Sequence, residues 1–269
     1  MALIHRITSL DLSELQPYRT LRRPAEHYEQ GIFVAEGEKV VRRLLASGLP
    51  TISMLLTEEW FATLTQSKIT LTAPDIFVAE KSLLEAIVGF RMHQGIMAVV
   101  RVPPEPSLDQ LVDSSPSPRL FVALDGLVFA ENVGVVVRNC AAFGVQGILV
   151  GGTSASPYLR RAVRNSMGTV FRMPVLHCPA LFETLMRLHT EYGMSILVTD
   201  AHTQTSLYHL DCVDNLCIVF GNEDSGVSDE VRGAATHAAR IPMAEGVDSL
   251  NVASASAVVL AEVARQRLE

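Results

Sequence analysis

The spacing of apolar residues in the first hundred positions alternates between a helical period and short strand-like runs. In residues 36–47, the side chains of Val40, Val41, Leu44 and Leu45 recur at helical spacing, which predicts an amphipathic helix. The next segments predict a strand near 51–57, a helix near 58–66, a strand near 76–79, a helix at 81–88 and a strand at 95–102. This alternation indicates a small α/β domain.

Four compact apolar runs follow in the second part of the chain, at 120–125, 147–151, 194–200 and 216–221, and each ends in Gly or Asp. Continuous apolar runs of this length are typical of parallel strands that are buried on both faces. Helices are expected near 132–143, 158–165, 179–191, 228–235 and 249–267. The pattern predicts an open parallel α/β sheet with helices on both faces and a ligand site at the carboxyl ends of its strands.

A stretch that is rich in proline and serine and has no periodicity, residues 103–118, separates the two patterns. Such a composition predicts a linker, here with room for one helical turn. The expected organisation is an N-terminal α/β domain over residues 1–102, a linker over 103–118 and a larger α/β domain over 119–269.

Composition narrows the class of protein. With 48% hydrophobic and 19% charged residues in a chain of 269, the sequence is that of a globular protein. Its four cysteines form no Cys-x-x-Cys pair, so we expect buried, reduced thiols and no metal site. The N-terminal segment lacks the apolar stretch of a signal peptide, and no apolar run is long enough to span a membrane. A cytoplasmic location is the simplest expectation.

The formal net charge of −7 argues against a protein that binds nucleic acid through its overall charge. The acidic excess lies in residues 105–269, however, because residues 1–104 carry eleven basic and eleven acidic side chains. Nineteen of the 22 basic residues are arginine, whose planar fork can hold a phosphate. The arginine clusters are therefore candidate RNA contacts, or else solvated helix faces: Arg22, Arg23, Arg42, Arg43, Arg160, Arg161 and Arg164.

The segment 124–144 carries the first candidate residues for chemistry. Asn132 is a suitable N-cap for the helix that follows it. Arg138 lies about 130° around that helix from the centre of its apolar stripe. Apolar residues also occupy the opposite side of this helix. We therefore expect both faces of the helix to be packed against other elements, with Arg138 emerging between the two packed surfaces. The alternative is a structural arginine that is paired with a carboxylate.

Two further loops place unusual residues at strand ends. Gly221 and Gly226 would allow tight backbone turns against a ligand, but the glycine fingerprint of dinucleotide sites and the Walker lysine motif are absent. In the segment 241–265, Asp248 or Ser249 is expected to cap a helix. The small residues at 253–257 indicate that something packs closely against that helix.

Together, the three loops resemble the signature motifs of the SpoU (TrmH-type) branch of the SPOUT RNA methyltransferases. The first loop matches at Asn132, Gly134 and Arg138, and the second at 220–223 (FGNE) and Gly226. The third matches at 241–243 (IPM) and 249–252 (SLNV).

The resemblance extends beyond these loops, with two departures. Residues 165–174 resemble the family's connecting stretch, and residues 15–102 resemble the small RNA-binding domain found ahead of many SpoU catalytic domains. Phe129, Ala130 and Glu131 stand where the family commonly has Asp-Pro, and Asn139–Cys140 replace a usual Thr–Ala pair. We expect these departures to affect RNA choice or loop shape more than the reaction.

The resemblance implies an S-adenosylmethionine-dependent enzyme that methylates a ribose 2′-hydroxyl of a structured RNA. It also implies a homodimer and a trefoil knot in the C-terminal domain. By analogy, the N-terminal domain favours ribosomal RNA over transfer RNA as the substrate.

The resemblance also implies a role for Arg138, because the family's corresponding arginine is held to activate the hydroxyl. A guanidinium stays protonated and is a poor base, so we expect Arg138 to grip the phosphate and ribose instead. The nucleotide would be held in register by Asn132, Glu223, Ser249 and Asn251, and the proton acceptor is left open. The cofactor pocket would be lined by Thr199, Gly221, Ile241, Met243 and Leu250.

Four alternatives stay open. The chain could be a non-catalytic RNA-binding or ribosome-assembly factor of the same fold, or it could methylate a transfer RNA ribose or a base atom. An unrelated nucleotide-dependent oxidoreductase is the fourth alternative, and the missing glycine fingerprint argues against it.

Overall fold

The computed structural model describes residues 2–9, 11–67, 71, 73–88 and 95–268. The chain divides into two compact units, and each consists of two stretches of sequence. Unit 1 contains Met1–Pro104 and Tyr158–Arg172, and unit 2 contains Glu105–Pro157 and Met173–Glu269. None of the helices in the described residues combines the length and the apolar character needed to cross a membrane.

Unit 1 is built on a five-stranded mixed sheet with the order β1-β4-β3-β5-β2. Strands β1, β4 and β3 are parallel, whereas β5 runs antiparallel to both β3 and β2. The strands span Leu3–Arg6 (β1), Ile32–Glu36 (β2), Thr51–Leu56 (β3), Asp75–Val78 (β4) and Ile96–Arg101 (β5). The helices of its first stretch are α1 (Gln16–Arg19), α2 (Pro24–Glu29), α3 (Glu38–Ser47), α4 (Glu58–Gln66) and α5 (Lys81–Val88).

Unit 2 is built on a six-stranded sheet with the order β11-β9-β10-β6-β7-β8, in which every pairing is parallel. The strands span Leu120–Asp125 (β6), Gly147–Gly151 (β7), Val175–Cys178 (β8), Ser195–Thr199 (β9), Leu216–Gly221 (β10) and His237–Ala239 (β11). The open parallel sheet expected from the apolar runs is therefore confirmed.

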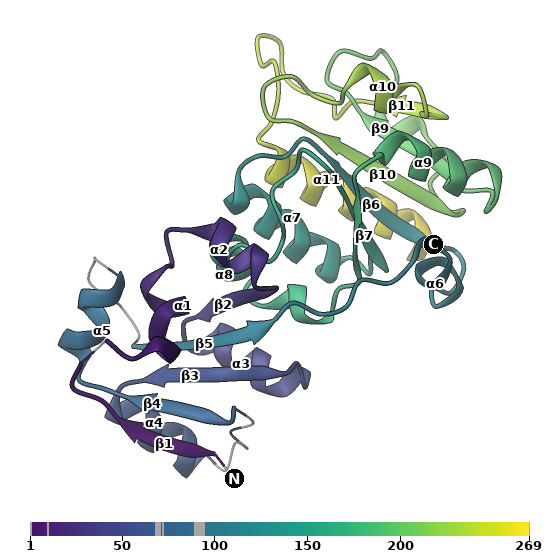
Figure 1. The fold of residues 1–269 in the computed structure, drawn as a ribbon. Helices are drawn as coiled ribbons and strands as arrows, with labels where there is room; N and C mark the ends of the chain where they lie inside the picture. The colour runs from purple at the N-terminus through teal and green to yellow at the C-terminus, as the bar shows by residue number, and fades with distance from the viewer. Residues whose placement is uncertain (1, 10, 68–70, 72, 89–94, 269) are drawn as a thin grey trace. The chain divides into compact units, whose positions relative to one another are not determined.

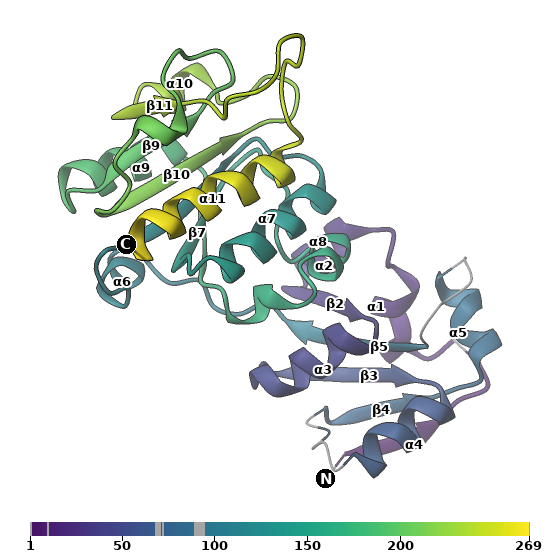
Figure 2. The same ribbon diagram turned by 180° about the vertical axis from the view of Figure 1, so that it is seen from behind.

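Helices cover both faces of this sheet, so unit 2 has three layers (Figures 1 and 2). One face packs against α6 (Leu108–Asp113), α9 (Leu181–Thr190) and α10 (Asp229–Arg232) in a continuous apolar core. The other face is covered by α7 (Ala130–Ala142) and α11 (Val252–Leu268), which lie side by side. Side chains of the strands point alternately to the two cores, which explains why β6 is apolar from Leu120 to Leu124.

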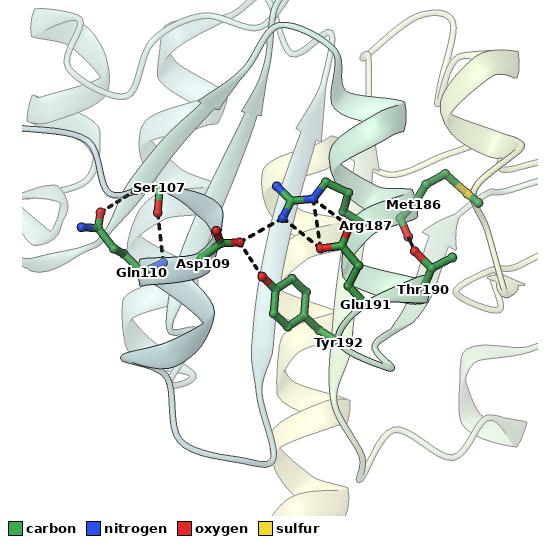
Figure 3. A network of polar contacts seen from close by, with 8 residues as sticks. All are labelled: Ser107, Asp109, Gln110, Met186, Arg187, Thr190, Glu191 and Tyr192. Carbon is green, nitrogen blue, oxygen red and sulfur yellow. Dashed lines mark hydrogen bonds and ion pairs between the residues drawn. The ribbon is translucent and has the colours of Figure 1, made fainter.

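Most of the expected linker, residues 105–118, is part of unit 2. Helix α6 begins with a capping box, in which Ser107 and Gln110 each bond the backbone of the other. Its apolar face is buried in the core of unit 2. On its outer side, Asp109 accepts hydrogen bonds from the Tyr192 hydroxyl at 2.5 Å and from Arg187 at 3.0 Å (Figure 3). The prolines around α6 indicated a linker, although the helix is amphipathic and its apolar residues form part of the core of unit 2.

The segment Tyr158–Arg172 departs from the expected division in the other direction, because it packs in unit 1. Helix α8 (Arg160–Asn165) and the 3-10 helix at Thr169–Arg172 lie in this segment. The ring of Phe33 in β2 lies 5.4 Å from that of Tyr158 and 5.8 Å from that of Phe171, measured between centroids. These aromatic contacts join residues more than 120 positions apart, so a local sequence pattern cannot predict them.

Candidate functional site

The polar loops of unit 2 meet where the strand order reverses. From β6 the chain continues to β7 and β8 on one side, whereas β10, the other neighbour of β6, belongs to the second half of the chain. A reversal of this kind opens a crevice at the carboxyl ends of the two central strands. The loops that leave β6 and β10 are joined there, because Asn222 Nδ2 donates to the Gly126 carbonyl at 2.7 Å and the Ser228 N–H donates to Asp125 Oδ2 at 2.7 Å.

A pocket of 440 Å³ lies beside this junction. Its walls come from the loops that follow β9, β10 and β11 and from the start of α11. The five residues expected around a cofactor all line this one pocket: Thr199, Gly221, Ile241, Met243 and Leu250. The tertiary structure thus brings together residues from three separate loops.

Gly221 is required by the loop itself. A Cβ atom at this position would lie 2.2 Å from the backbone nitrogen of Val227. The approach is close because Asn222 and Gly226 exchange two backbone hydrogen bonds, of 2.9 and 3.0 Å, in a tight turn. The glycine expected to permit close approach of a ligand therefore permits close approach of the loop's own backbone.

Asn132 joins the three motif loops. Its Nδ2 donates to Glu223 Oε1 at 2.8 Å, and its Oδ1 accepts from Asn251 Nδ2 at 3.2 Å. The other oxygen of Glu223 accepts from the backbone N–H of Val128 at 3.4 Å. Glu223 and Asn251 also line the pocket, as does Ser249. Four of the five expected catalytic residues therefore converge at one edge of the pocket.

Both expected helix caps differ from the structure. Helix α7 begins at Ala130, with Phe129 at the N-cap position, because the side chain of Asn132 is engaged by Glu223 and Asn251. Helix α11 begins at Val252, and Asn251 Oδ1 accepts from the Ala253 N–H at 2.9 Å. Asn251, and neither Asp248 nor Ser249, is thus the capping residue, since only it directly precedes the helix.

Arg138, the fifth expected catalytic residue, is exposed on α7 and does not line the pocket. Within the described residues its guanidinium makes no hydrogen bond or ion pair. The alternative, a structural arginine that is paired with a carboxylate, is therefore not observed in the described part of the chain. One face of α7 is buried through Val133, Val136 and Val137. The second covered face expected for this helix is absent from the described chain, where Ala142 is exposed.

Asp200 and Arg232 form an ion pair on the pocket wall that the sequence reasoning missed. Burial acts to raise the pKa of Asp200, but the backbone N–H of His202 and the Arg232 guanidinium outweigh it and hold this pKa below its usual value. The pair ties the loop after β9 to α10. An acidic residue directly after a buried parallel strand is the signal that could have identified Asp200.

The candidate RNA contacts of unit 1 differ in their surroundings. Arg160 forms an ion pair with Glu36, and their side chains are only 14% and 11% exposed. This pair holds α8 on β2, so we no longer expect Arg160 to contact RNA. Arg23 and Arg42 form exposed or half-exposed pairs within their own helices, and Arg43 donates to the Met167 carbonyl at 2.6 Å. The side chains of Arg22, Arg161 and Arg164 are exposed.

The cysteines are buried, free thiols, as expected. Burial raises the pKa of both Cys140 and Cys217, which keeps these thiols protonated. Within the residues that the structure describes, no cluster of three His, Cys, Asp or Glu side chains could hold a metal ion.

Comparison with known proteins identifies the family. The model of the SpoU rRNA methylase family matches residues 119–261. A protein of Mycobacterium avium (strain 104), described as an uncharacterized tRNA/rRNA methyltransferase, is 34% identical over 254 residues, which cover 91% of this chain and 81% of the relative. The AdoMet-bound rRNA methyltransferase of Sinorhizobium meliloti superimposes with a TM-score of 0.84 at 25% identity over 99% of each chain. An RNA 2′-O ribose methyltransferase superimposes with a TM-score of 0.80 at 25% identity over 98% of this chain and all of the other. The chain belongs to the SpoU rRNA methylase family.

Proposed function

We propose that this chain transfers a methyl group from S-adenosylmethionine to a ribose 2′-hydroxyl of a structured RNA, with ribosomal RNA favoured over transfer RNA. The observation that carries the proposal is the hydrogen-bonded series Asn251–Asn132–Glu223, which joins three distant motifs at the edge of one pocket. The S. meliloti relative, whose structure holds AdoMet, and the 2′-O ribose methyltransferase support the same chemistry.

The pocket suits S-adenosylmethionine in size and lining. Its volume of 440 Å³ lies in the range of about 300–1,000 Å³ that small-ligand sites occupy. Ile241, Met243 and Leu250 offer apolar surface to an adenine ring. The carboxylates of Glu223 and Asp224 on the walls favour the positive charges of a sulfonium and an amine. This lining supports the cofactor role proposed for the pocket.

The residues of the site act chiefly by alignment. Bound S-adenosylmethionine supplies a methyl group that its sulfonium activates for transfer. Alignment of the reacting atoms is worth roughly 7–11 kcal/mol of the barrier in favourable cases. Asn132 is held in one orientation, because it donates to Glu223 and accepts from Asn251. We assign the positioning of the nucleotide to these three residues and Ser249, and the grip on the phosphate to the planar fork of Arg138.

A homodimer is part of the proposal. Arg138 is exposed and lies outside the pocket, and apolar residues such as Ala141 and Ala142 are exposed near the end of α7. A second copy that covers this face would give α7 its expected second packed surface. Sedimentation of the purified protein tests this part. The trefoil knot implied by the family stays a prediction.

The decisive experiment measures which atom of which RNA receives the methyl group. Purified protein is incubated with labelled S-adenosylmethionine and with ribosomal or transfer RNA from cells that lack the gene. The RNA is then digested and analysed by mass spectrometry. A 2′-O-methyl nucleoside in ribosomal RNA is expected. Label in a base or only in transfer RNA would establish the corresponding alternative. A protein without affinity for S-adenosylmethionine in calorimetry would contradict the proposal and favour a non-catalytic RNA-binding factor.

A further inference from the structure

Two loops that the hydrogen bond between Asn132 and Asn251 joins both carry exposed apolar side chains. Val128 and Phe129 lie in the loop before α7, and Val247 and Leu250 lie in the loop before α11. These four side chains are 40% to 55% exposed. Single exposed apolar residues are ordinary, but several of them in two joined loops beside a ligand pocket indicate contact with a partner.

Phe129 is the aromatic member of this group, and its backbone is held on both sides. Before it, the Val128 N–H donates to Glu223 and the Ala155 N–H donates to the Leu127 carbonyl at 2.7 Å. After it, the Phe129 carbonyl accepts the first hydrogen bond of α7, from the Val133 N–H at 3.1 Å. The ring, 54% exposed, is thus presented from a fixed backbone.

We infer that Phe129 is a stacking surface for an unpaired base of the RNA, next to the nucleotide that is methylated. The inference rests on the proposed function and adds that the substrate is a single-stranded or splayed segment. Proteins that read RNA in loops and bulges commonly stack unpaired bases on aromatic side chains. The nearby carboxylate of Glu223 disfavours a phosphate at this position, whereas the uncharged face of a base meets no such repulsion.

Phe129 lies outside the lining of the pocket proposed for the methyl donor. We therefore expect it to act on the choice of RNA and to leave that pocket unchanged.

The test compares Phe129→Ala, Phe129→Leu and Phe129→Tyr with the unaltered protein. The substrates are ribosomal RNA and transfer RNA from cells that lack the gene, with labelled S-adenosylmethionine as donor. Stacking is worth about 1–3 kcal/mol per base, so Phe129→Ala should raise the KM for RNA at least about fivefold. The kcat and the Kd for S-adenosylmethionine should stay within about twofold. Phe129→Tyr should restore the KM, and Phe129→Leu should not, because leucine is apolar but has no flat face.

Two controls distinguish base stacking from a general apolar contact or a subunit contact at Phe129. Rescue by Phe129→Leu, or a change in sedimentation of Phe129→Ala, would identify Phe129 as an apolar or subunit contact and overturn the inference. Filter binding of the same RNA requires no turnover. Equal RNA affinity of the unaltered protein and Phe129→Ala would overturn the stacking role even in a protein that transfers methyl groups normally. Absence of any transfer by the unaltered protein, with a difference in RNA affinity, would instead overturn the proposed function.

Discussion

Glu223 holds the loop between β6 and α7 at two points, through the side-chain amide of Asn132 and the backbone N–H of Val128. The side-chain oxygen of Asn132 in turn accepts a hydrogen bond from Asn251. The position of the Glu223 carboxylate is therefore linked, through the side chains of Asn132 and Asn251, to the start of α11. At the scale of single residues, the site is a set of directional hydrogen bonds in which each donor has one acceptor. A change that turns an acceptor into a donor should therefore act on geometry before it acts on stability.

Replacing Glu223 by Gln tests this residue. A glutamine keeps the shape but removes the charge and one acceptor, so either Asn132 or the Val128 N–H loses its acceptor. A hydrogen bond to a charged group is worth about 1.5–3 kcal/mol, so we expect kcat/KM to fall about 10- to 100-fold and the melting temperature to fall by a few degrees. Glu230→Gln, on the exposed side of α10, is the matched control and should have normal activity. Equal activity of the two variants would contradict a positioning role for Glu223.

Arg138 provides the second prediction at this scale. Because its guanidinium is exposed and unpaired within the described chain, Arg138→Ala should leave the fold intact. The variant should lose methyl transfer, while the Kd for S-adenosylmethionine in calorimetry stays within a few-fold. Arg138→Lys should fail as well, since an ammonium cannot replace a planar fork. Near-normal turnover in either variant would show that another residue grips the substrate.

Helices α7 and α11 form the layer that carries this site, and side-chain contacts fix them to each other and to the loops below. Asn139 of α7 donates to the Ala253 carbonyl and to the Ser256 hydroxyl of α11, both at 2.9 Å. At the far end of α11, Arg267 donates to backbone carbonyls of two separate loops, including those of Arg119 and Cys212. At the scale of elements, the side chain of Asn139 has a structural role, which is the contact between these helices.

The Asn139 contact predicts a loss of stability in Asn139→Ala. Ser256 is fully buried, so removing the amide leaves its hydroxyl oxygen without this donor, at a cost of about 1–3 kcal/mol, whereas the Ala253 carbonyl still accepts from Ser256. Thermal denaturation should show a melting temperature lower by roughly 2–10 °C. Ser254→Ala, on the exposed side of α11, should melt as the unaltered protein does. A melting temperature unaffected by Asn139→Ala would mean that the two helices pack without this amide.

Glu262 of α11 predicts a pH dependence. Hydrogen bonds from Arg265 and Gln266 lower its pKa to about 2, against an ordinary value of about 4.3. Because the folded pKa is the lower one, the carboxylate stabilises the fold above pH ~4.3, and this contribution is lost as the pH falls towards 2. The difference in melting temperature between Glu262→Gln and the unaltered protein should therefore be largest near neutral pH and shrink below pH ~4. A difference that does not vary with pH would exclude this carboxylate as its cause.

The whole molecule consists of two units, and the segment Tyr158–Arg172 interrupts the sequence of unit 2 to complete the core of unit 1. The Arg160–Glu36 pair and the ring contacts of Phe33 attach this segment to β2. At this scale, basic residues that look alike in the sequence divide into two roles. Arg160 is nearly buried and structural, whereas the side chains of Arg22, Arg23 and Arg43 are exposed.

This division predicts opposite effects of arginine substitutions. Exposed ion pairs and single exposed hydrogen bonds contribute little, so replacing Arg22, Arg23, Arg42 and Arg43 by Gln should lower the melting temperature by only a few degrees, although Arg43 also loses its hydrogen bond to the Met167 carbonyl. It should weaken RNA binding and flatten its dependence on salt, because fewer counterions are released. Arg160→Gln leaves Glu36 without its partner and should cost about 3–5 kcal/mol of stability, seen in thermal denaturation. Unchanged RNA binding in the fourfold variant would remove these arginines from recognition.

The strands show what local sequence could and could not predict. The seven interior strands, β3 to β7, β9 and β10, lie where the apolar runs predicted strands. The strands that the sequence reasoning missed, β1, β2, β8 and β11, are the edge strands of the two sheets. An interior strand has a neighbouring strand on each side, and helices cover both of its faces. Its apolar run is therefore continuous and can be recognised in the sequence. The edge strands β1, β8 and β11 are three or four residues long and only partly buried, so they leave no such run. Strand β2 is the exception, because its buried apolar run Ile32–Ala35 was visible in the sequence and was overlooked.

The sequence by itself determined the α/β class, the parallel sheet of unit 2, the family, and the residues that meet at the pocket, since periodicity and motif spacing are properties of local stretches of chain. Only the tertiary structure decided that α6 belongs to unit 2 and Tyr158–Arg172 to unit 1. The same holds for the true cap of α11, which is Asn251, and for the buried partner of Arg160. Each of these depends on which surfaces and polar groups become neighbours in space, and hydrogen bonds and burial between distant residues leave no period in the sequence.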